Sequence, residues 1–264
     1  MQTFTDIYKY RFILSNLVGK ELKAQYRNMS LGFLWALLNP LVLVTVLSLA
    51  WTIFLDAPAS FPVLVIVALI PYNFFTYCFN GCAVSSPGYV PLVKKIRFPR
   101  QILPISVILT HLIHFAIQFL LVVAVLVIFP HPGNTFSWHL LWLPVILVVQ
   151  LGLVVGVGLL IAGLNVVYRD VQYIVESLLV VLFWGSPILW SAGPESRLAA
   201  HPTLYYVYYL NPLAGILEAW RSVLYFGRSP SLITFGMATG VALILGVIGV
   251  RSFWKHERDF ADLI

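Results

Sequence analysis

Residues 101–168 read QILPISVILTHLIHFAIQFLLVVAVLVIFPHPGNTFSWHLLWLPVILVVQLGLVVGVGLLIAGLNVVY, and these 68 consecutive positions contain no Asp, Glu, Lys or Arg. A helix needs only about 20 apolar residues to cross the roughly 30 Å hydrocarbon core of a bilayer, so this stretch is long enough for two crossings. Residues 130–134, Pro-His-Pro-Gly-Asn, form a strong turn signal within it. The stretch therefore predicts two membrane spans, over about 102–129 and 139–163.

The composition of the whole chain also indicates an integral membrane protein. Of its 264 residues, 60% are hydrophobic and only 10% are charged, and the mean hydropathy is +0.92. A soluble domain carries about 25% charged residues, so the composition excludes a free cytosolic enzyme and a disordered chain. The 16 Lys and Arg exceed the 10 Asp and Glu. In a membrane protein this excess records topology, and we expect no nucleic-acid partner.

Charged residues mark the ends of the other spans, because each costs roughly 2.5–3.5 kcal/mol at the centre of a membrane helix. No charge lies between Arg27 and Asp56, or between Asp56 and Lys94. The remaining uncharged stretches predict one span each, at about 32–55, 62–82, 172–191 and 230–250. We therefore expect an all-α integral membrane protein with six transmembrane helices in one domain, residues 31–264.

One apolar and aromatic segment, residues 203–226, does not fit a simple span, because it contains Asn211-Pro212, Glu218 and Arg221. We interpret it as re-entrant helices before the last span, which are tolerated in a membrane where they pack on protein. The alternative is a seventh span, which would place the two termini on opposite sides of the membrane.

The distribution of basic residues favours six spans. With the N-terminus inside, the cytoplasmic segments carry 13 Lys and Arg residues, whereas the outer segments carry three. Cytoplasmic loops are enriched in these residues. We therefore expect a multi-pass protein of the cytoplasmic membrane with both termini in the cytoplasm.

Residues 1–30 predict an N-terminal amphipathic helix at the cytoplasmic interface. Five apolar residues share one helical face: Ile7, Tyr10, Leu14, Leu17 and Val18. The alternative is a cytoplasmic lead-in held by anionic lipid. The uncharged apolar stretch at residues 12–19 is too short for a cleavable signal, so we expect the chain to keep its first residues.

The sequence contains no motif of a catalytic or metal site. A phosphate-binding loop of the form G-x-x-x-x-G-K-[ST] is missing. Cys78 and Cys82 are interpreted as small apolar fillers, because the Cys and His spacings of a metal site do not accompany them. His111 and His114 could form a proton relay inside a span or be hydrogen-bonded packing residues. We expect this chain to be no enzyme and to hold no metal or cofactor of its own.

Two glycine pairs, Gly152/Gly156 and Gly236/Gly240, lie on faces of the fourth and sixth predicted spans. Small residues at this four-residue spacing let helices approach closely. The pattern fits a contact within one subunit and a contact between two subunits equally well.

The predicted cytoplasmic loop at residues 83–101 reads AVSSPGYVPLVKKIRFPRQ and is basic near its end. It predicts either an anchor at the lipid headgroups or a docking surface for a soluble partner.

Four groups of residues carry a family resemblance when they are taken together. They are LKAQYR at 22–27 with LGFLWALLNP at 31–40, RFPRQILP at 97–104, LNVVYRDV at 164–171, and NPL at 211–213 with EAWR at 218–221. The chain resembles the membrane (permease) subunits of type-2 ABC exporters for bacterial cell-surface polysaccharides, and the similarity runs nearly end to end. The first two groups look closer to O-antigen and teichoic acid permeases than to capsule permeases.

The resemblance implies a homodimer of six-span subunits in the bacterial inner membrane, together with two copies of a separate subunit that binds ATP and Mg. A lipid-linked polysaccharide would pass between the two membrane subunits. The 83–101 loop and the 165–171 turn would face the ATPase. We expect four charged residues to couple the two proteins, since a basic loop suits an acidic patch on a partner: Arg97, Arg100, Arg169 and Asp170.

Aromatic residues are candidates for the wall of the export path, because sugar rings stack their CH faces on aromatic side chains. They make up 15% of the chain and include 8 Trp. Six candidates lie in the first, second and fifth predicted spans: Trp35, Tyr72, Phe75, Phe183, Trp184 and Trp190. Packing in the core is equally compatible with any single one of them.

The sequence leaves two other functional classes as alternatives. A secondary transporter would need charges inside the membrane and paired broken helices, and this chain has almost no intramembrane charge. A membrane-embedded glycan-modifying transferase would need several acids or histidines at one membrane face, where only His111 with His114 and Asp170 with Glu176 are available.

Overall fold

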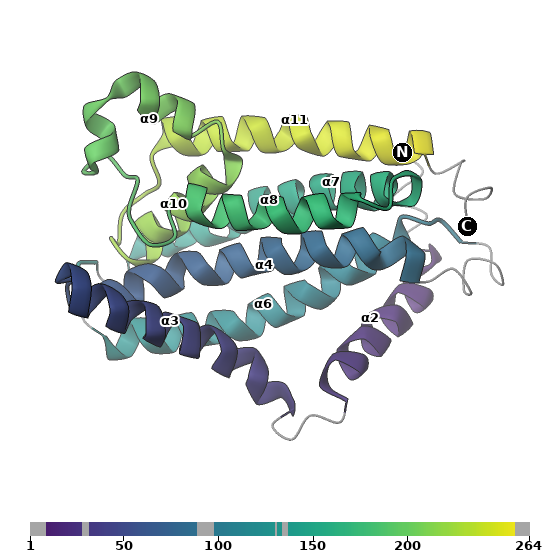
Figure 1. The fold of residues 1–264 in the computed structure, drawn as a ribbon, viewed down its shortest axis with the longest axis horizontal. Helices are drawn as coiled ribbons and strands as arrows, with labels where there is room; N and C mark the ends of the chain where they lie inside the picture. The colour runs from purple at the N-terminus through teal and green to yellow at the C-terminus, as the bar shows by residue number, and fades with distance from the viewer. Residues whose placement is uncertain (1–8, 28–31, 89–97, 130, 134–136, 257–264) are drawn as a thin grey trace.

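A computed structural model describes residues 9–27, 32–88, 98–129, 131–133 and 137–256. Every regular element in these ranges is a helix, as the sequence predicts. In chain order they are α2 (Arg11–Tyr26), η1 (Gly32–Leu34), α3 (Trp35–Leu55), α4 (Phe61–Gly88), α6 (Ile102–Ile128), η2 (Trp138–Trp142), α7 (Leu143–Val167), α8 (Val171–Gly185), η3 (Arg197–Ala200), α9 (Pro202–Tyr208), α10 (Pro212–Leu224) and α11 (Leu232–His256). The long helices form one bundle, with α9 at one end, whereas α2 begins and α11 finishes at the other (Figure 1).

Five helices are long and apolar enough to cross a membrane. They are Trp35–Leu55, Phe61–Ser85, Ile102–Ile128, Trp138–Val167 and Leu232–Lys255. These helices agree closely with five of the six predicted spans. The chain is therefore a multi-pass membrane protein by the length and composition of its helices.

The predicted span at 172–191 corresponds to a shorter helix. Helix α8 has 15 residues, which rise about 22 Å, less than the roughly 30 Å hydrocarbon core. It ends at Gly185 because Ser186 is extended, with φ −111° and ψ 156°, and precedes Pro187. A residue before proline is disfavoured in the helical region. The helices alone thus establish five candidate spans and a sixth apolar helix that is too short to cross unaided.

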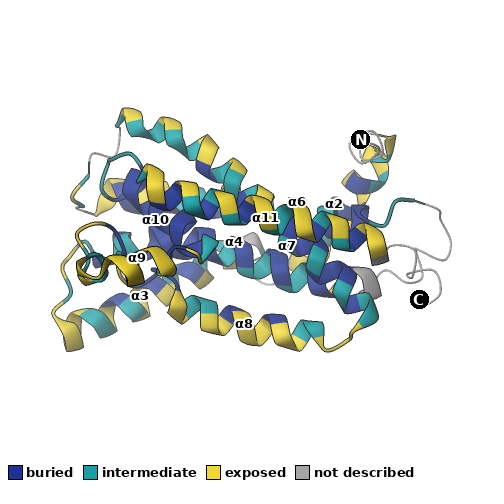
Figure 2. Cartoon of the chain, turned by 90° about the horizontal axis from the view of Figure 1, so that it is seen from above, coloured by how far each residue is buried: buried dark blue, intermediate teal, exposed yellow. Residues whose placement is uncertain are grey.

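Helix α4 lies at the centre of the bundle. In its most apolar window 72% of the residues are buried, compared with 17% in α3, and α4 contacts α3, α6, α7, α8 and α10. A helix that is hydrophobic all round suits such a position, and the run Val63–Ile70 is buried except for Leu64. Helices α3 and α8 pack on α4 and lie along one edge of the bundle, with long exposed faces (Figure 2).

A proline near the start of α3 explains a contact between helices. Pro40 has no N–H, so the carbonyl of Ala36 four residues earlier has no helical partner. The side-chain amide of Gln118, a buried residue of α6, donates to this carbonyl at 3.0 Å. The buried amide therefore satisfies the polar group that the proline leaves free and joins α3 to α6.

Glycines bring α7 and α11 together within the subunit. A Cβ at Gly156 would collide with the backbone of Gly246, and one at Gly249 would collide with the backbone of Gly156. By contrast, a Cβ at Gly236 or Gly240 would meet nothing within 4 Å. Gly156 therefore makes the contact within one subunit, whereas the Gly236/Gly240 pair faces no other part of the described chain.

Helix α2 is the described part of the predicted N-terminal helix. Its apolar side packs on the start of α6, where Leu14 and Leu17 contact Ile102 and Leu103. Residues 1–8, which include Ile7 of the predicted apolar face, lie outside the described residues.

The segment predicted to be re-entrant forms two short helices. Pro202–Tyr208 (α9) is largely exposed and Pro212–Leu224 (α10) is inserted into the bundle. Asn211 separates them and accepts a hydrogen bond from the backbone N–H of Leu213 at 3.1 Å, as a helix N-cap does. With 7 and 13 residues, neither helix can cross a bilayer. The seventh-span alternative would need one continuous helix here, and the chain does not form it.

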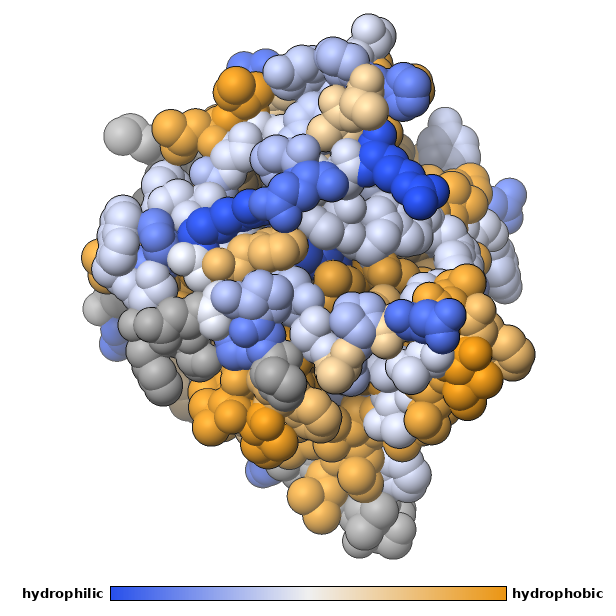
Figure 3. Space-filling view, turned by 90° about the vertical axis from the view of Figure 1, so that its left-hand side faces the viewer, coloured by the Kyte–Doolittle hydropathy of each residue, from blue (hydrophilic) through white to orange (hydrophobic). Residues whose placement is uncertain are grey.

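The end of the bundle that carries α9 has a polar surface. Hydrophilic and neutral side chains cover much of this end, and hydrophobic ones lie mainly toward its rim (Figure 3). An exposed ion pair between Arg228 and Glu195, with 2.6 Å between Nη1 and Oε1, lies here. Such a surface suits contact with water at the membrane boundary.

Candidate functional site

The chain leaves the helical conformation after α8 and passes through residues 186–192. The backbone carbonyls of this segment therefore lack the partners that a continuing helix would provide. Pro187, Ile188 and Leu189 are nevertheless buried, and an unpaired buried carbonyl is costly. The segment needs donors from elsewhere in the protein.

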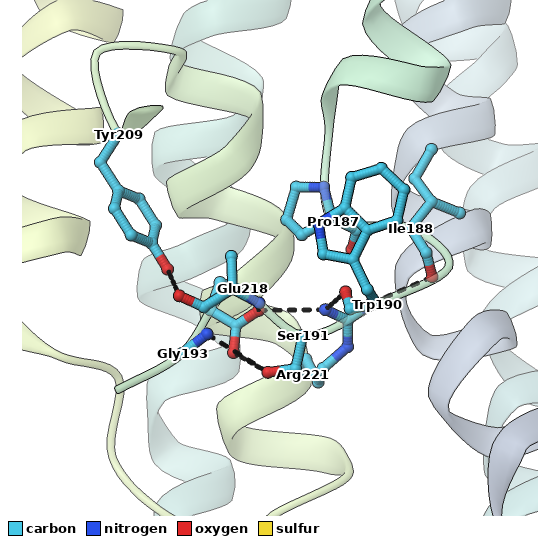
Figure 4. Close-up of polar contacts among 9 residues, drawn as sticks. Pro187, Ile188, Trp190, Ser191, Gly193, Tyr209, Glu218 and Arg221 are labelled. Atoms are coloured by element: carbon cyan, nitrogen blue, oxygen red, sulfur yellow. Dashed lines mark hydrogen bonds and ion pairs between the residues drawn. The ribbon is translucent and has the colours of Figure 1, made fainter. Parts of the chain in front are cut away.

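Arg221 of α10 supplies these donors. Its Nη2 donates to the carbonyl oxygens of Pro187 at 2.6 Å and Ile188 at 3.1 Å, and its Nη1 donates to that of Trp190 at 2.6 Å. The side chain itself is fully buried. Figure 4 shows the guanidinium reaching from α10 toward this segment.

Glu218, one turn before Arg221 on α10, balances the buried positive charge. Its Oε2 lies 3.0 Å from Nη1 of Arg221 and accepts the backbone N–H of Ala192 at 3.2 Å. Its Oε1 accepts the hydroxyl of Ser191 at 2.9 Å. A Cβ at Gly193 would lie 2.9 Å from Oε1, so glycine leaves the carboxylate its space (Figure 4).

Tyr209 and Asn211 extend these contacts to the connection between α9 and α10. The hydroxyl of Tyr209 donates to the carbonyl of Ala192 at 2.7 Å. Burial raises the pKa of Tyr209, so its hydroxyl keeps the proton that it donates. Asn211 donates to Oγ of Ser186 at 3.2 Å. We call Glu218, Arg221, Tyr209 and the segment that they hold, residues 186–192, the Arg221 cluster.

A buried amide also anchors α10 to the bundle. Gln150 of α7 accepts the indole N–H of Trp220 at 2.7 Å and donates to the carbonyl of Pro71 in α4 at 3.1 Å. Gln150 is fully buried. The hydrogen bonds therefore join α4, α7 and α10 in the interior.

The Arg221 cluster can position the chain but offers no reactive group. Each charge has an opposite charge beside it, and hydrogen bonds occupy both carboxylate oxygens of Glu218. Such a pair fixes geometry, because removing one partner would leave the other buried and uncompensated. It holds Trp190, which is 41% exposed, at the edge of the bundle.

The six aromatic candidates for the export path divide into two groups. Tyr72 and Phe75 are buried in α4, and the Tyr72 hydroxyl donates to the carbonyl of Leu179 in α8. Trp35, Trp184 and Trp190 are 47%, 57% and 41% exposed.

Phe183 connects the two groups. It is half-buried, and its ring centroid lies 5.5 Å from that of Tyr72 and 5.4 Å from that of Trp184. The structure thus brings Tyr72, Phe183 and Trp184 together. Trp35 begins α3 whereas Trp184 lies near the end of α8, and the two helices run in the same direction (Figure 1).

The turn between α7 and α8 carries two of the predicted coupling residues. Arg169 and Asp170 are both exposed at its tip. The buried Asn165 supports the turn, because its amide donates to the carbonyl of Ala83 at 2.7 Å and its Oδ1 accepts the N–H of Gln172 at 3.1 Å. This one side chain joins α4, α7 and α8, and it holds the charged tip on a rigid base.

The other two predicted coupling residues lie on the predicted cytoplasmic loop. Arg100 is half-buried just before α6, which begins at the same end of the bundle as α8 (Figure 1). Arg97 lies outside the described residues.

The histidine and cysteine pairs lie inside the bundle. The ring centroids of His111 and His114 are 5.7 Å apart, and Tyr77 stacks on His111 at 5.7 Å. Cys78 and Cys82 are buried free thiols. Within the described ranges, no three His, Cys, Asp or Glu residues are grouped closely enough to hold a metal ion.

Comparison with known proteins identifies the family. The sequence profile of the family described as "ABC-2 type transporter" matches residues 14–225. The chain belongs to this family. It is therefore a membrane subunit of an ABC transporter, and the resemblance seen in the sequence is confirmed.

Individual relatives of this ABC-2 transporter subunit match almost its whole length. It is 31% identical to the "O-antigen export system permease protein RfbA" of Myxococcus xanthus, over 98% of both chains. It is 26% identical to an RfbA protein of Klebsiella pneumoniae, over 96% of this chain and 95% of that one. The "Polysialic acid transport protein KpsM" of Escherichia coli is 26% identical over 88% of this chain and 90% of its own.

Four polar residues escaped the sequence interpretation or received no role in it. In the sequence, Glu218 and Arg221 are charges in an apolar segment and part of a family motif, and Asn165 is part of another family motif. Gln150 lies in the apolar middle of α7, whose other amide, Asn165, lies near the end of the helix. A polar residue inside a membrane helix is expensive and usually faces a polar partner, which is the signal that could have identified all four.

Proposed function

We propose that this chain is the membrane subunit of an exporter for a lipid-linked cell-surface polysaccharide, of O-antigen-like or teichoic-acid-like type. The observation that carries the proposal is the 31% identity to an O-antigen export permease over 98% of both chains. The similarity covers the full membrane domain, including the segments that form α8, α10 and the turn between α7 and α8. The polymer chemistry of the relatives is thus the best guide to the substrate.

Six crossings with both termini in the cytoplasm form part of the proposal. Five long helices and the 13-to-3 distribution of basic residues support it. The fifth crossing would consist of α8 together with the non-helical residues 186–192. Irregular backbone is tolerated at membrane depth where protein buries it, and Arg221 provides this for the carbonyls of the segment.

The polymer would pass between two copies of the subunit. The exposed edge formed by α3 and α8 supports this arrangement, because it carries Trp35 and Trp184, and Trp190 is exposed in the segment that follows α8. Tyr72 and Phe75 would support the wall from behind, since the subunit already buries them. Phe183 would link the two layers.

A separate ATP-binding subunit would drive transport and would bind ATP and Mg itself. The exposed tip with Arg169 and Asp170, on a base fixed by Asn165, supports a contact with that subunit. Arg97 and Arg100 would contribute to the same contact. Arg169→Ala should then weaken co-purification of the ATPase while membrane insertion stays intact, and lost insertion would show that the residue serves topology alone.

Export in cells tests the proposed function. Deletion of the gene from its host should remove the polysaccharide from the surface of intact cells, while the polymer stays detectable after permeabilisation. A plasmid copy should restore it, and a plasmid copy lacking α10 serves as the control. Unchanged surface polysaccharide in the deletion strain would overturn the proposal.

A further inference from the structure

An apolar groove runs along the surface between α7 and α11. It has a volume of about 480 Å³, within the range of roughly 300–1,000 Å³ that small-molecule sites occupy. On α7 it is lined by Val148, Val149 and Gly152, and on α11 by a stripe of residues from Thr239 to Trp254. This groove shares no residue with the Arg221 cluster or with the aromatic candidates.

Two other glycines, Gly152 and Gly246, open the groove beside the point where α7 and α11 pack. At Gly156 the backbones of α7 and α11 touch, so the helices cannot come closer. One turn earlier, a Cβ at Gly152 would meet nothing within 4 Å, and one at Gly246 would meet only the carbonyl of Gly152 at 3.7 Å. The missing side chains leave a channel open to the outside of the bundle. Val148 and Leu243, 68% and 65% exposed, form its rims.

One end of the groove is basic. Arg251 and Trp254 line this end, and both are exposed. Arg251 forms no ion pair or side-chain hydrogen bond with the residues that the structure describes. Helix α11 contains no Asp or Glu between residues 232 and 256, so no acidic group on this helix competes for the guanidinium.

The dimensions of the groove match one lipid chain. From Thr239 to Arg251 the helix rises about 18 Å, and one leaflet contributes about 15 Å of the roughly 30 Å hydrocarbon core. An acyl chain whose headgroup lies at Arg251 would therefore reach the apolar far end of the groove. A tryptophan beside the headgroup, here Trp254, suits the membrane interface.

We propose that this groove binds an anionic phospholipid, with one acyl chain between α7 and α11 and the phosphate on Arg251. Charge complementarity selects the anionic lipid, since basic pockets between membrane helices bind such headgroups. A second copy of the chain is the alternative occupant, and the oligomeric state of the blocking variants below distinguishes it from a lipid. The proposal concerns a resident lipid and does not depend on the exported substrate.

Native mass spectrometry of the detergent-purified transporter, complete with its ATPase subunit, tests the site. The delipidated complex is incubated with dioleoyl phosphatidylglycerol or dioleoyl phosphatidylethanolamine, and retained lipid is counted. Arg251→Gln should lower retention of phosphatidylglycerol about tenfold, the effect of one lost charged contact. The control Lys23→Gln removes an exposed charge of α2 outside the groove and should change it little. Equal losses in both variants would overturn the proposal.

A second pair of variants tests the acyl chain. Gly152→Leu should fill the groove without a collision and remove retention of both lipids. Gly236→Leu, which also adds a side chain into open space but outside the groove, should leave it unchanged. Val148→Trp provides a second way to block the groove if Gly152→Leu does not fold. Unchanged lipid retention in a folded blocking variant would overturn the proposal. Dissociation of such a variant into single membrane subunits would also overturn it, because that result would identify this face as a subunit interface.

Discussion

Helices α8 and α10 show opposite relations between polarity and burial. Helix α8 is mostly apolar, yet only Val175 and Leu179 of its 15 residues are buried. Helix α10 carries an ion pair, yet every residue from Leu213 to Leu224 is buried. In a soluble protein the apolar helix would lie inside and the charged one outside.

The difference follows from the surroundings of a membrane protein. Hydrocarbon accepts apolar side chains as readily as a protein core does, so an apolar surface experiences no force that drives it inward. Charged groups, in contrast, must find partners within the protein. Burial in this chain is therefore decided by where Glu218 and Arg221 can be paired, and α10 lies inside because the 186–192 segment provides that place.

Removal of the positive charge from α10 should have the largest effect. Arg221→Leu leaves Glu218 buried without its counter-ion and leaves three carbonyls without a donor. We expect a loss of about 3–5 kcal/mol in stability, measured as the thermal unfolding midpoint of the purified complex. Arg228→Gln breaks the exposed ion pair with Glu195 and should cost about 0–1 kcal/mol. Similar midpoints for the two variants would show that the α10 charges are not buried in the assembled protein.

A matched pair of leucines compares the two helices directly. Leu217 of α10 is fully buried, whereas Leu178 of α8 is 52% exposed. Leu217→Ala should cost about 2–5 kcal/mol, as truncations in a packed core do, and Leu178→Ala should cost much less. The thermal unfolding midpoints of the two variants measure this difference. A larger loss at Leu178 would indicate that a second subunit covers α8 tightly.

The stability of the turn before α8 should depend on the side-chain amide of Asn165. Asn165→Ala removes the donor to Ala83 and the acceptor for Gln172, and each unsatisfied buried group costs about 1–3 kcal/mol. Because Asn165 supports the tip with Arg169 and Asp170, we also expect weaker co-purification of the ATPase subunit. Gln172→Ala, which keeps the backbone N–H, is the control. If Asn165→Ala recovers a normal amount of the ATPase subunit, Asn165 does not contribute to the contact with that subunit.

Replacement of Trp184, at the exposed end of α8, should have the smallest effect on stability but a measurable effect on transport. If Trp184 lines the polymer path, Trp184→Ala removes a stacking contact of about 1 kcal/mol and slows export of long chains, while Trp184→Phe is milder. Phe75→Ala, in the buried group, should instead lower stability by about 3–5 kcal/mol. Polymer length on the cell surface and the thermal midpoint are measured together. Normal export with a large stability loss in Trp184→Ala would mark it as a packing residue.

The sequence predicts the elements of this fold that depend on hydropathy. Uncharged stretches bounded by charges locate five long helices, since length and apolarity are what a bilayer requires. Asn211-Pro212 and the charges after it indicate a re-entrant segment. The family motifs identify the transporter family before any contact is known.

The contacts between these elements could not be predicted in the same way. Gln118, Gln150 and Asn165 each bind a backbone carbonyl that is far away in the sequence, and a single sequence does not pair such positions. The span at 172–191 ends early because Ser186-Pro187 breaks the helix. The absence of charges, from which the span is predicted, gives no sign of this break. The signal for it is Pro187 itself.

The position of α10 depends most on the pairing of Glu218 with Arg221 in the interior, and a double-mutant cycle measures the energy of this pairing. Thermal midpoints are compared for Glu218→Leu, Arg221→Leu, the double variant and the unmodified transporter. Each single variant leaves an uncompensated buried charge, so the double variant should be more stable than the sum of the two losses predicts, with a coupling of about 0.5–3 kcal/mol. Losses that simply add would contradict a buried ion pair at the centre of this fold.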